Sequence, residues 1–211
     1  MTACAADTGT ADWGAVAVCC RILGALLYLP PNDPVMAPIL ASLREERWLL
    51  EWPFGEQETL ARLGRDFAAA LSDDDADAQM CAEYQRLFIG PNALEAPPWG
   101  SVYLEEEGTL FGDTTLALRS FLEEQGVSLN TGMHEPDDHI GLLLWATAWL
   151  AEHDCPSAVV TLFDRHLLSW SGRYLGQLEA AARHAFYRCV AQLASTTFSR
   201  MRAAMTPPSL S

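Results

Sequence analysis

Residues 134–139, His-Glu-Pro-Asp-Asp-His, gather side chains that could do chemistry. The carboxylates of Glu135, Asp137 and Asp138 could hold a guanidinium group, because a carboxylate accepts two parallel N–H bonds from arginine in a geometry that lysine cannot copy. A structural explanation is also sufficient. Pro136 suits the first position of a helix, and acidic side chains near a helix N-terminus are stabilising by about 0.3–1 kcal/mol each. The pattern alone leaves both interpretations open.

Asp138 and His139 are also candidates for acid–base catalysis, and a small hydrolase that uses either of them is one hypothesis. Adjacent side chains on a helix point about 100° apart, so one of these two residues cannot act as a general base that the other orients. The sequence contains no Gly-x-Ser-x-Gly, Cys-His, His-Glu-x-x-His or Gly-x-Gly-x-x-Gly signature to accompany them. We therefore expect no catalytic residues, no metal site and no cofactor.

The stretch 84–103, YQRLFIGPNALEAPPWGSVY, is a second unusual segment. It is interrupted by proline and glycine at Gly90, Pro91, Pro97, Pro98 and Gly100. Proline fixes φ and lacks an N–H donor, so this pattern predicts a stiff loop. The loop still carries large apolar side chains such as Phe88 and Trp99. These side chains either fold onto the core or line a rigid apolar groove for a ligand.

The 211-residue chain carries 28 acidic and 13 basic side chains, for a net charge of −15, and its basic residues are all arginine. Without lysine, a P-loop lysine, a Schiff-base lysine and a lysine general base are excluded. The negative charge argues against a nucleic-acid partner, which requires a cationic face, and would attract a cationic one. Since half the residues are hydrophobic, the chain can bury a substantial core.

Helical periodicity dominates the chain. It predicts an all-α, bundle-like single domain of about eight to nine helices over residues 1–205, with a long Pro/Gly-rich loop and a disordered tail over 206–211. Asp33-Pro34 predicts the start of a short helix, and Pro136 predicts the start of a long apolar one that ends at His153. The best candidate for a strand is the short segment 101–104.

The N-terminal segment lacks the positive start and apolar stretch of a secretory signal. The longest apolar run, 140–151, is shorter than the roughly 20 residues that a membrane-spanning helix needs. The six cysteines include no Cys-x-x-Cys pair, which is typical of buried free thiols in a reducing cytosol. We expect a cytoplasmic protein without stable membrane insertion.

Ala-Pro-Pro-Trp-Gly-Ser at 96–101 combined with Glu-Pro-x-Asp-His at 135–139 is more specific than either motif alone. With these motifs the chain resembles the TorD/DmsD-type family of cytoplasmic redox-enzyme maturation chaperones, and most closely the branch that serves dimethyl sulfoxide reductase. The resemblance covers nearly the whole chain. It includes RILGAL (21–26), YQRLFIGP (84–91), APPWGSVYLE (96–105), LFGDTTLALR (110–119), EPDDHIGLLL (135–144), AWLAE (148–152), HLLSW (166–170) and AFYR (185–188).

The resemblance implies an all-helical chaperone without catalytic activity. Its partner would be the N-terminal twin-arginine leader of a molybdopterin reductase catalytic subunit, held back from export until the cofactor is loaded. The twin-arginine export machinery is a further partner to consider. Carried over residue by residue, the resemblance implies a leader-binding site made of Tyr28, Tyr84, Leu87, Phe88, Pro98, Trp99, Gly112, Asp137, Asp138 and His139. Asn92 stands where close relatives carry an aromatic residue, which leaves open a stacking contribution at that position.

A twin-arginine leader has a cationic start and an apolar centre, so it requires carboxylates beside an apolar groove. Segment 135–139 would supply the carboxylates and the proline-stiffened loop the groove. Three alternatives remain besides this hypothesis. They are a chaperone for trimethylamine N-oxide, formate or nitrate reductase, a small hydrolase, and an acidic scaffold without a groove.

Overall fold

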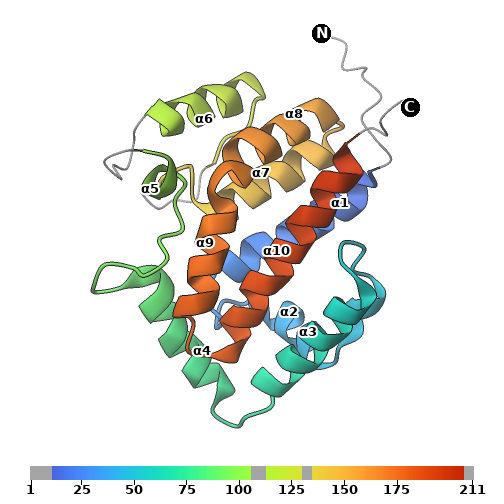
Figure 1. The fold of residues 1–211 in the computed structure, drawn as a ribbon, viewed down its shortest axis with the longest axis vertical. Coiled ribbons are helices and arrows are strands. Elements are labelled where there is room, and N and C mark those ends of the chain that lie inside the picture. Colours follow the sequence, from blue (N-terminus) through green and yellow to red (C-terminus); the bar gives the residue numbers. More distant parts are fainter. Residues whose placement is uncertain (1–10, 106–112, 130–134, 207–211) are drawn as a thin grey trace.

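The computed structural model describes residues 11–105, 113–129 and 135–206, and within these ranges the chain is all-α (Figure 1). The elements are α1 (Trp13–Tyr28), α2 (Met36–Arg44), the 3-10 turn η1 (Arg47–Leu50), α3 (Gln57–Ala70), α4 (Ala76–Tyr84), the π-helical η2 (Gln85–Ile89), α5 (Ser101–Leu104), α6 (Asp113–Glu124), α7 (Ile140–Glu152), α8 (Pro156–Thr161), the π-helical η3 (Leu162–Leu167), α9 (Leu168–Ala181) and α10 (Ala185–Met205). Because α4 continues into η2, and α8 continues through η3 into α9, the described residues form nine continuous helices besides η1. The predicted fold class is confirmed.

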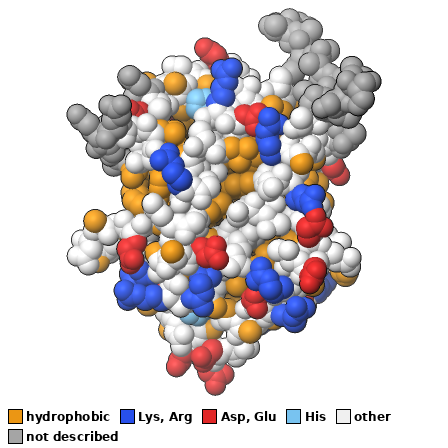
Figure 2. Space-filling view, in the orientation of Figure 1, with side chains coloured by type: hydrophobic (Ala, Val, Ile, Leu, Met, Phe, Trp, Pro, Cys, Tyr) orange, Lys and Arg blue, Asp and Glu red, His pale blue; other side chains and the backbone are white. Residues whose placement is uncertain are grey.

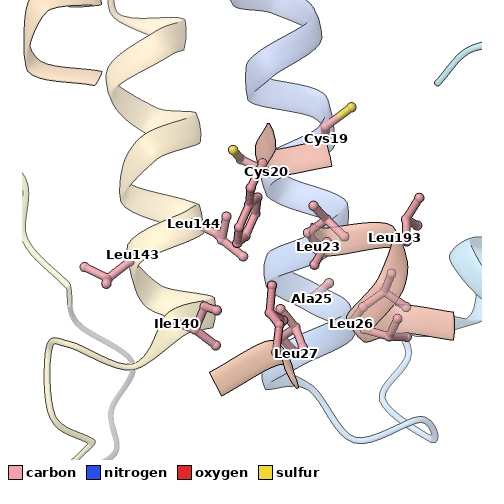
Figure 3. Close-up of a cluster of buried hydrophobic side chains, with 14 of the residues drawn as sticks. Cys19, Cys20, Leu23, Ala25, Leu26, Leu27, Ile140, Leu143, Leu144 and Leu193 are labelled. Atoms are coloured by element: carbon pink, nitrogen blue, oxygen red, sulfur yellow. The ribbon is translucent and has the colours of Figure 1, made fainter. Parts of the chain in front are cut away.

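The core is centred on α1 and α7, which lie side by side (Figure 3). Leu23 and Leu27 of α1 and Ile140 and Leu144 of α7 are fully buried between them, and Leu193 of α10 joins the same cluster. The two helices can approach closely because each has a glycine at the contact: a Cβ on Gly141 would lie 3.0 Å from the carbonyl oxygen of Gly24. Figure 2 shows hydrophobic side chains in the central hollows of one face, with arginine and acidic side chains around them.

Two predicted helix starts are wrong. Helix α2 begins at Met36, because the Asp33 side chain accepts a 2.9 Å bond from the N–H of Val35 and closes a turn before the helix. Helix α7 begins at Ile140 instead of Pro136, with His139 as its N-cap. The residues before Ile140 bond to the loop that precedes α5 and cannot adopt helical geometry at the same time.

The best candidate for a strand, 101–104, is not a strand, because these residues form the short helix α5. Among the described residues the structure has a single isolated β-bridge, between Trp99 and His139, and no strand. The chain from Pro156 to Ala181 is one continuous helix, because α8 runs through η3 into α9.

Glu83 at the end of α4 ties this helix to the turn between α9 and α10. Its carboxylate accepts bonds from the Arg86 guanidinium, at 2.8 and 2.9 Å, and from the N–H groups of Arg183 and His184. Burial raises the pKa of Glu83, but these donors outweigh burial and hold the pKa below its ordinary value. The network fixes the end of α4, from which the chain continues through η2 into the loop at 90–100.

The cysteines that the structure describes are free thiols. Cys19, Cys20 and Cys189 are buried, and Cys81 and Cys155 are half-buried. Burial raises the pKa of Cys19 to about 12, which makes this thiol unreactive. The tail beyond Thr206 lies outside the described residues.

Candidate functional site

The two motifs singled out from the sequence interlock through their backbones. Trp99 and His139 form the antiparallel bridge, with the N–H of Ile140 donating to the carbonyl of Pro98 at 2.9 Å. The N–H of Gly100 donates to the carbonyl of Asp138 at 3.2 Å. These bonds place the loop before α5 directly against the segment that leads into α7. Pro98, Trp99, Asp138 and His139, which the sequence placed in one site, therefore lie together.

Asp138 is buried, with 5% of its surface exposed. One carboxylate oxygen, Oδ2, accepts a 2.6 Å bond from the N–H of Ser101, which is the first residue of α5. The other, Oδ1, has no hydrogen-bond partner among the described residues. Asp138 borders a cavity of about 130 Å³ that is also lined by Arg165, His166 and Trp170. A buried carboxylate oxygen with spare acceptor capacity suits a charged N–H donor such as a guanidinium group.

His139 is a structural residue at the start of α7. Its Nδ1 accepts a 3.1 Å bond from the N–H of Gly141, which caps the helix, and its ring packs edge-on against Tyr28 with centroids 5.0 Å apart. Burial lowers its pKa to about 3, so the imidazole is neutral near pH 7. A buried capping imidazole that stays neutral is poorly suited to acid–base catalysis, which argues against a hydrolase mechanism through His139.

The three neighbouring carboxylates have different partners. Glu135 accepts a 2.6 Å bond from the indole Nε1 of Trp99, a half-buried side chain. Asp137 pairs with Arg119 of α6, whose Nε lies 2.8 Å from the Asp137 carboxylate. Asp137 borders a cavity of about 230 Å³, separate from the one that Asp138 lines. Adjacent aspartates therefore face two different cavities.

Leu87, Phe88 and Tyr84 lie behind this site, in the core. Leu87 and Phe88 are 1% and 7% exposed, and Phe88 stacks on Tyr84 with ring centroids 5.1 Å apart. The Tyr84 hydroxyl donates to the carbonyl of Tyr28 at 2.7 Å. These side chains are part of the core, so the interpretation in which this segment folds onto the core describes them. Gly112 lies outside the described residues.

A cavity of about 660 Å³ lies between α1, α7 and the chain after α6, and the sequence reasoning missed it. Its walls are mostly apolar and include Tyr28, Leu142, Trp145, Trp149 and residues 126–129. Trp145 and Trp149 are both half-buried. They lie four residues apart on α7, which puts them on one face of the helix. That spacing was the available signal, because two tryptophans on one helix face that is not fully buried indicate a binding surface.

Among the described residues, no group of three His, Cys, Asp or Glu side chains is placed to hold a metal ion. No helix in the described ranges has the length and apolar character needed to cross a membrane.

Comparison with known proteins finds one matching family and several similar chaperones. The family described as nitrate reductase delta subunit matches residues 55–175. The chain is 41% identical over 192 residues to the Tat proofreading chaperone DmsD of Salmonella typhimurium, covering 91% of each chain. It is 36% identical over 187 residues to the chaperone protein YcdY of Escherichia coli, covering 87% of this chain and 92% of that one.

The crystal structure of a candidate redox enzyme maturation protein from Archaeoglobus fulgidus has a similar fold. Its TM-score is 0.51 at 20% identity, over 85% of this chain and 93% of that one. The two sequence relatives are both named as chaperones, in agreement with the chaperone family that the sequence motifs indicate.

Proposed function

The chain belongs to the TorD/DmsD-type family of redox-enzyme maturation chaperones, and from this membership we propose that it acts as a Tat proofreading chaperone. In the cytoplasm it binds the N-terminal twin-arginine leader of a molybdopterin reductase catalytic subunit of the dimethyl sulfoxide reductase type. It holds this leader back from the twin-arginine export machinery until the cofactor has been loaded.

The interlocked segments 98–101 and 135–140 supply the observation that supports this function best. They hold Asp138 buried, with one carboxylate oxygen bonded to Ser101 and the other buried without a hydrogen-bond partner. An arginine of the leader has the planar, charged N–H groups that such an oxygen accepts most strongly. The carboxylate is held in place by the backbone around it, so little of its own motion is lost when a leader binds.

The charge of the chain fits the same partner. Its net charge of −15 attracts a cationic leader, which speeds encounter and makes binding weaken as salt rises. The leader must later be released for export, so a moderate affinity is expected. A dissociation constant of about 1 μM corresponds to a binding free energy of about −8 kcal/mol.

Isothermal titration of the full chain with a synthetic twin-arginine leader from a dimethyl sulfoxide reductase catalytic subunit tests the function. We expect binding in the micromolar range that weakens when the arginine pair is replaced by two lysines. Failure to bind any twin-arginine leader, at low salt and at physiological salt, would contradict the proposal.

A second candidate client is a nitrate reductase, because the family that matches residues 55–175 is described as nitrate reductase delta subunit. Leaders of dimethyl sulfoxide, trimethylamine N-oxide, formate and nitrate reductases, titrated side by side, distinguish the clients. Tightest binding to the dimethyl sulfoxide reductase leader supports the first candidate, and tightest binding to the nitrate reductase leader supports the second.

A further inference from the structure

We propose that Arg119 holds, in the free protein, the place on Asp137 that a guanidinium group of the leader takes on binding. The apolar centre of the leader then lies in the adjoining cavity beside Trp145 and Trp149. This inference rests on the proposed function and gives it a second carboxylate and a location for the apolar part of the ligand.

The ion pair of Arg119 with Asp137 is placed at the surface, where it can be exchanged. Nε of Arg119 lies 2.8 Å from Oδ2 of Asp137. The Arg119 side chain is 46% exposed, whereas that of Asp137 is 21% exposed. The carboxylate is therefore the more firmly enclosed partner, and the arginine can leave into solvent without disrupting the core. An exposed ion pair of this kind stabilises a fold only weakly.

The cavity beside Asp137 meets the large apolar cavity at a shared wall. Val127, Ser128 and Leu129 line both cavities. On one side of this wall are Asp137 and Glu123, with Arg119 on Asp137. On the other are Trp145 and Trp149, together with Arg21, whose guanidinium group is paired with Glu152. An acidic end thus adjoins an aromatic, apolar one within a short stretch of surface.

This order of charge and apolarity matches a twin-arginine leader. Its cationic start requires carboxylates, and its apolar centre requires a nonpolar surface large enough to cover several side chains. The large cavity has a volume of about 660 Å³, which is in the range of sites that bind medium-sized ligands. Charge complementarity therefore favours a cationic-apolar peptide over an anionic or purely apolar occupant.

Exchange of one guanidinium for another explains how the site can be selective without being tight. The carboxylate of Asp137 keeps an arginine partner before and after binding, so the leader arginine adds little net affinity there. A ligand with lysine exchanges the planar guanidinium for an ammonium ion and loses its donor geometry. The displaced Arg119 stays four residues from Glu123 on α6, where the two side chains can pair.

Arg119→Gln, Asp137→Asn and the double variant test the exchange by titration with a synthetic twin-arginine leader of a dimethyl sulfoxide reductase catalytic subunit and with its lysine-lysine counterpart. Arg119→Gln should tighten binding of the twin-arginine leader by about threefold or more, because the Asp137 carboxylate then has no internal partner that the leader must displace. Asp137→Asn by itself should change binding little, because the internal ion pair and the leader contact are lost together. Arg119→Gln should have no effect in the Asp137→Asn background. Trp149→Ala should weaken binding of both peptides about equally.

Matched controls come from α3, where Arg62 pairs with Asp66 at 3.1 Å. Arg62→Gln and Asp66→Asn change the net charge as the test variants do, and neither should change binding.

An equal effect of Arg62→Gln and Arg119→Gln would mean general electrostatic attraction and would overturn the exchange. Unchanged or weaker binding by Arg119→Gln, with the wild type still binding, would overturn it and leave the proposed function standing. Unchanged binding by Trp149→Ala would overturn the apolar location, and absence of wild-type binding to every leader would instead overturn the function itself.

Discussion

The carboxylate of Asp138 accepts a 2.6 Å hydrogen bond from the backbone N–H of Ser101, so one side chain joins the segment before α7 to the first residue of α5. The backbone bonds of Pro98 and Gly100 to the same segment make this connection rigid. A single aspartate therefore holds the loop in place, and its second oxygen, buried without a hydrogen-bond partner, is the acceptor that we propose for a guanidinium group of the leader.

Replacing Asp138 by asparagine should separate these two roles. Asn keeps the shape and can still accept from Ser101, but it loses the charge that a guanidinium group needs. We expect leader affinity to fall by at least about 1 kcal/mol, or roughly fivefold, in calorimetric titration. Asp66→Asn, which removes the same charge from an exposed pair on α3, should bind as the wild type does. Equal affinities of Asp138→Asn and the wild type would remove Asp138 from the site.

Trp99→Phe keeps an aromatic ring at the site but deletes the indole N–H that Glu135 accepts at 2.6 Å. Without this bond Glu135 no longer holds Trp99, and the loop is less firmly fixed. Leader binding should therefore weaken by about 1 kcal/mol. Trp52→Phe is the control, because Trp52 donates its indole N–H to Thr197 in the core. That change should lower the free energy of unfolding by about 1 kcal/mol in urea and leave leader affinity unchanged. The reverse pattern, with binding lost only in Trp52→Phe, would speak against Trp99.

His139 should make stability depend on pH. Its pKa is about 3 in the folded protein and 6.5 as an ordinary value, so the unfolded chain binds a proton between these values and the folded one does not. The stabilising contribution is present above about pH 6.5 and is lost as the pH falls towards 3. Between about pH 7 and about pH 5, the wild type should lose about 2 kcal/mol more unfolding free energy than His139→Asn, which keeps a capping acceptor. Urea unfolding curves at the two pH values measure this, and parallel losses in both proteins would refute it.

Gly141→Ala should separate α1 from α7. An added Cβ would lie 2.7 Å from Cβ of Tyr28 and 3.0 Å from the carbonyl oxygen of Gly24, and neither position has room to give way. Overpacking of this kind costs about 1–3 kcal/mol of unfolding free energy. Gly172→Ala in α9 is the control, because nothing lies within 4 Å of the added atom. That substitution should stabilise the protein by about 0.5–1 kcal/mol in thermal or urea unfolding. A Gly141→Ala protein as stable as the wild type would show that α1 and α7 can move apart at little cost.

The helix class could be predicted from the sequence because amphipathic periodicity and proline stops are local properties. The starts of α2 and α7 could not. Pro136 looked like a first helical residue, yet the preceding bonds to the loop at 98–101 decided where α7 begins. A hydrogen bond between segments far apart in the chain outcompetes a local start signal, and no window of sequence contains both partners.

Prediction of the site was limited in the same way. The motifs at 96–101 and 135–139 could be singled out from the sequence, and the structure brings them into contact. The burial of Leu87 and Phe88 in the core could not be predicted from the apolar character of this segment. Burial depends on what packs above a side chain as well as on its hydrophobicity.

The sequence by itself determined the all-α class, the negative charge, the absence of lysine and the resemblance to a chaperone family, since each follows from residue types and local order. Only the tertiary structure decided that Asp137 and Asp138, neighbours in the chain, face separate cavities, and that Arg119 is the partner of one of them. The reason is that side-chain partners are set by which helices pack together. α5, α6 and η3 line the cavities around these carboxylates and come from other parts of the sequence.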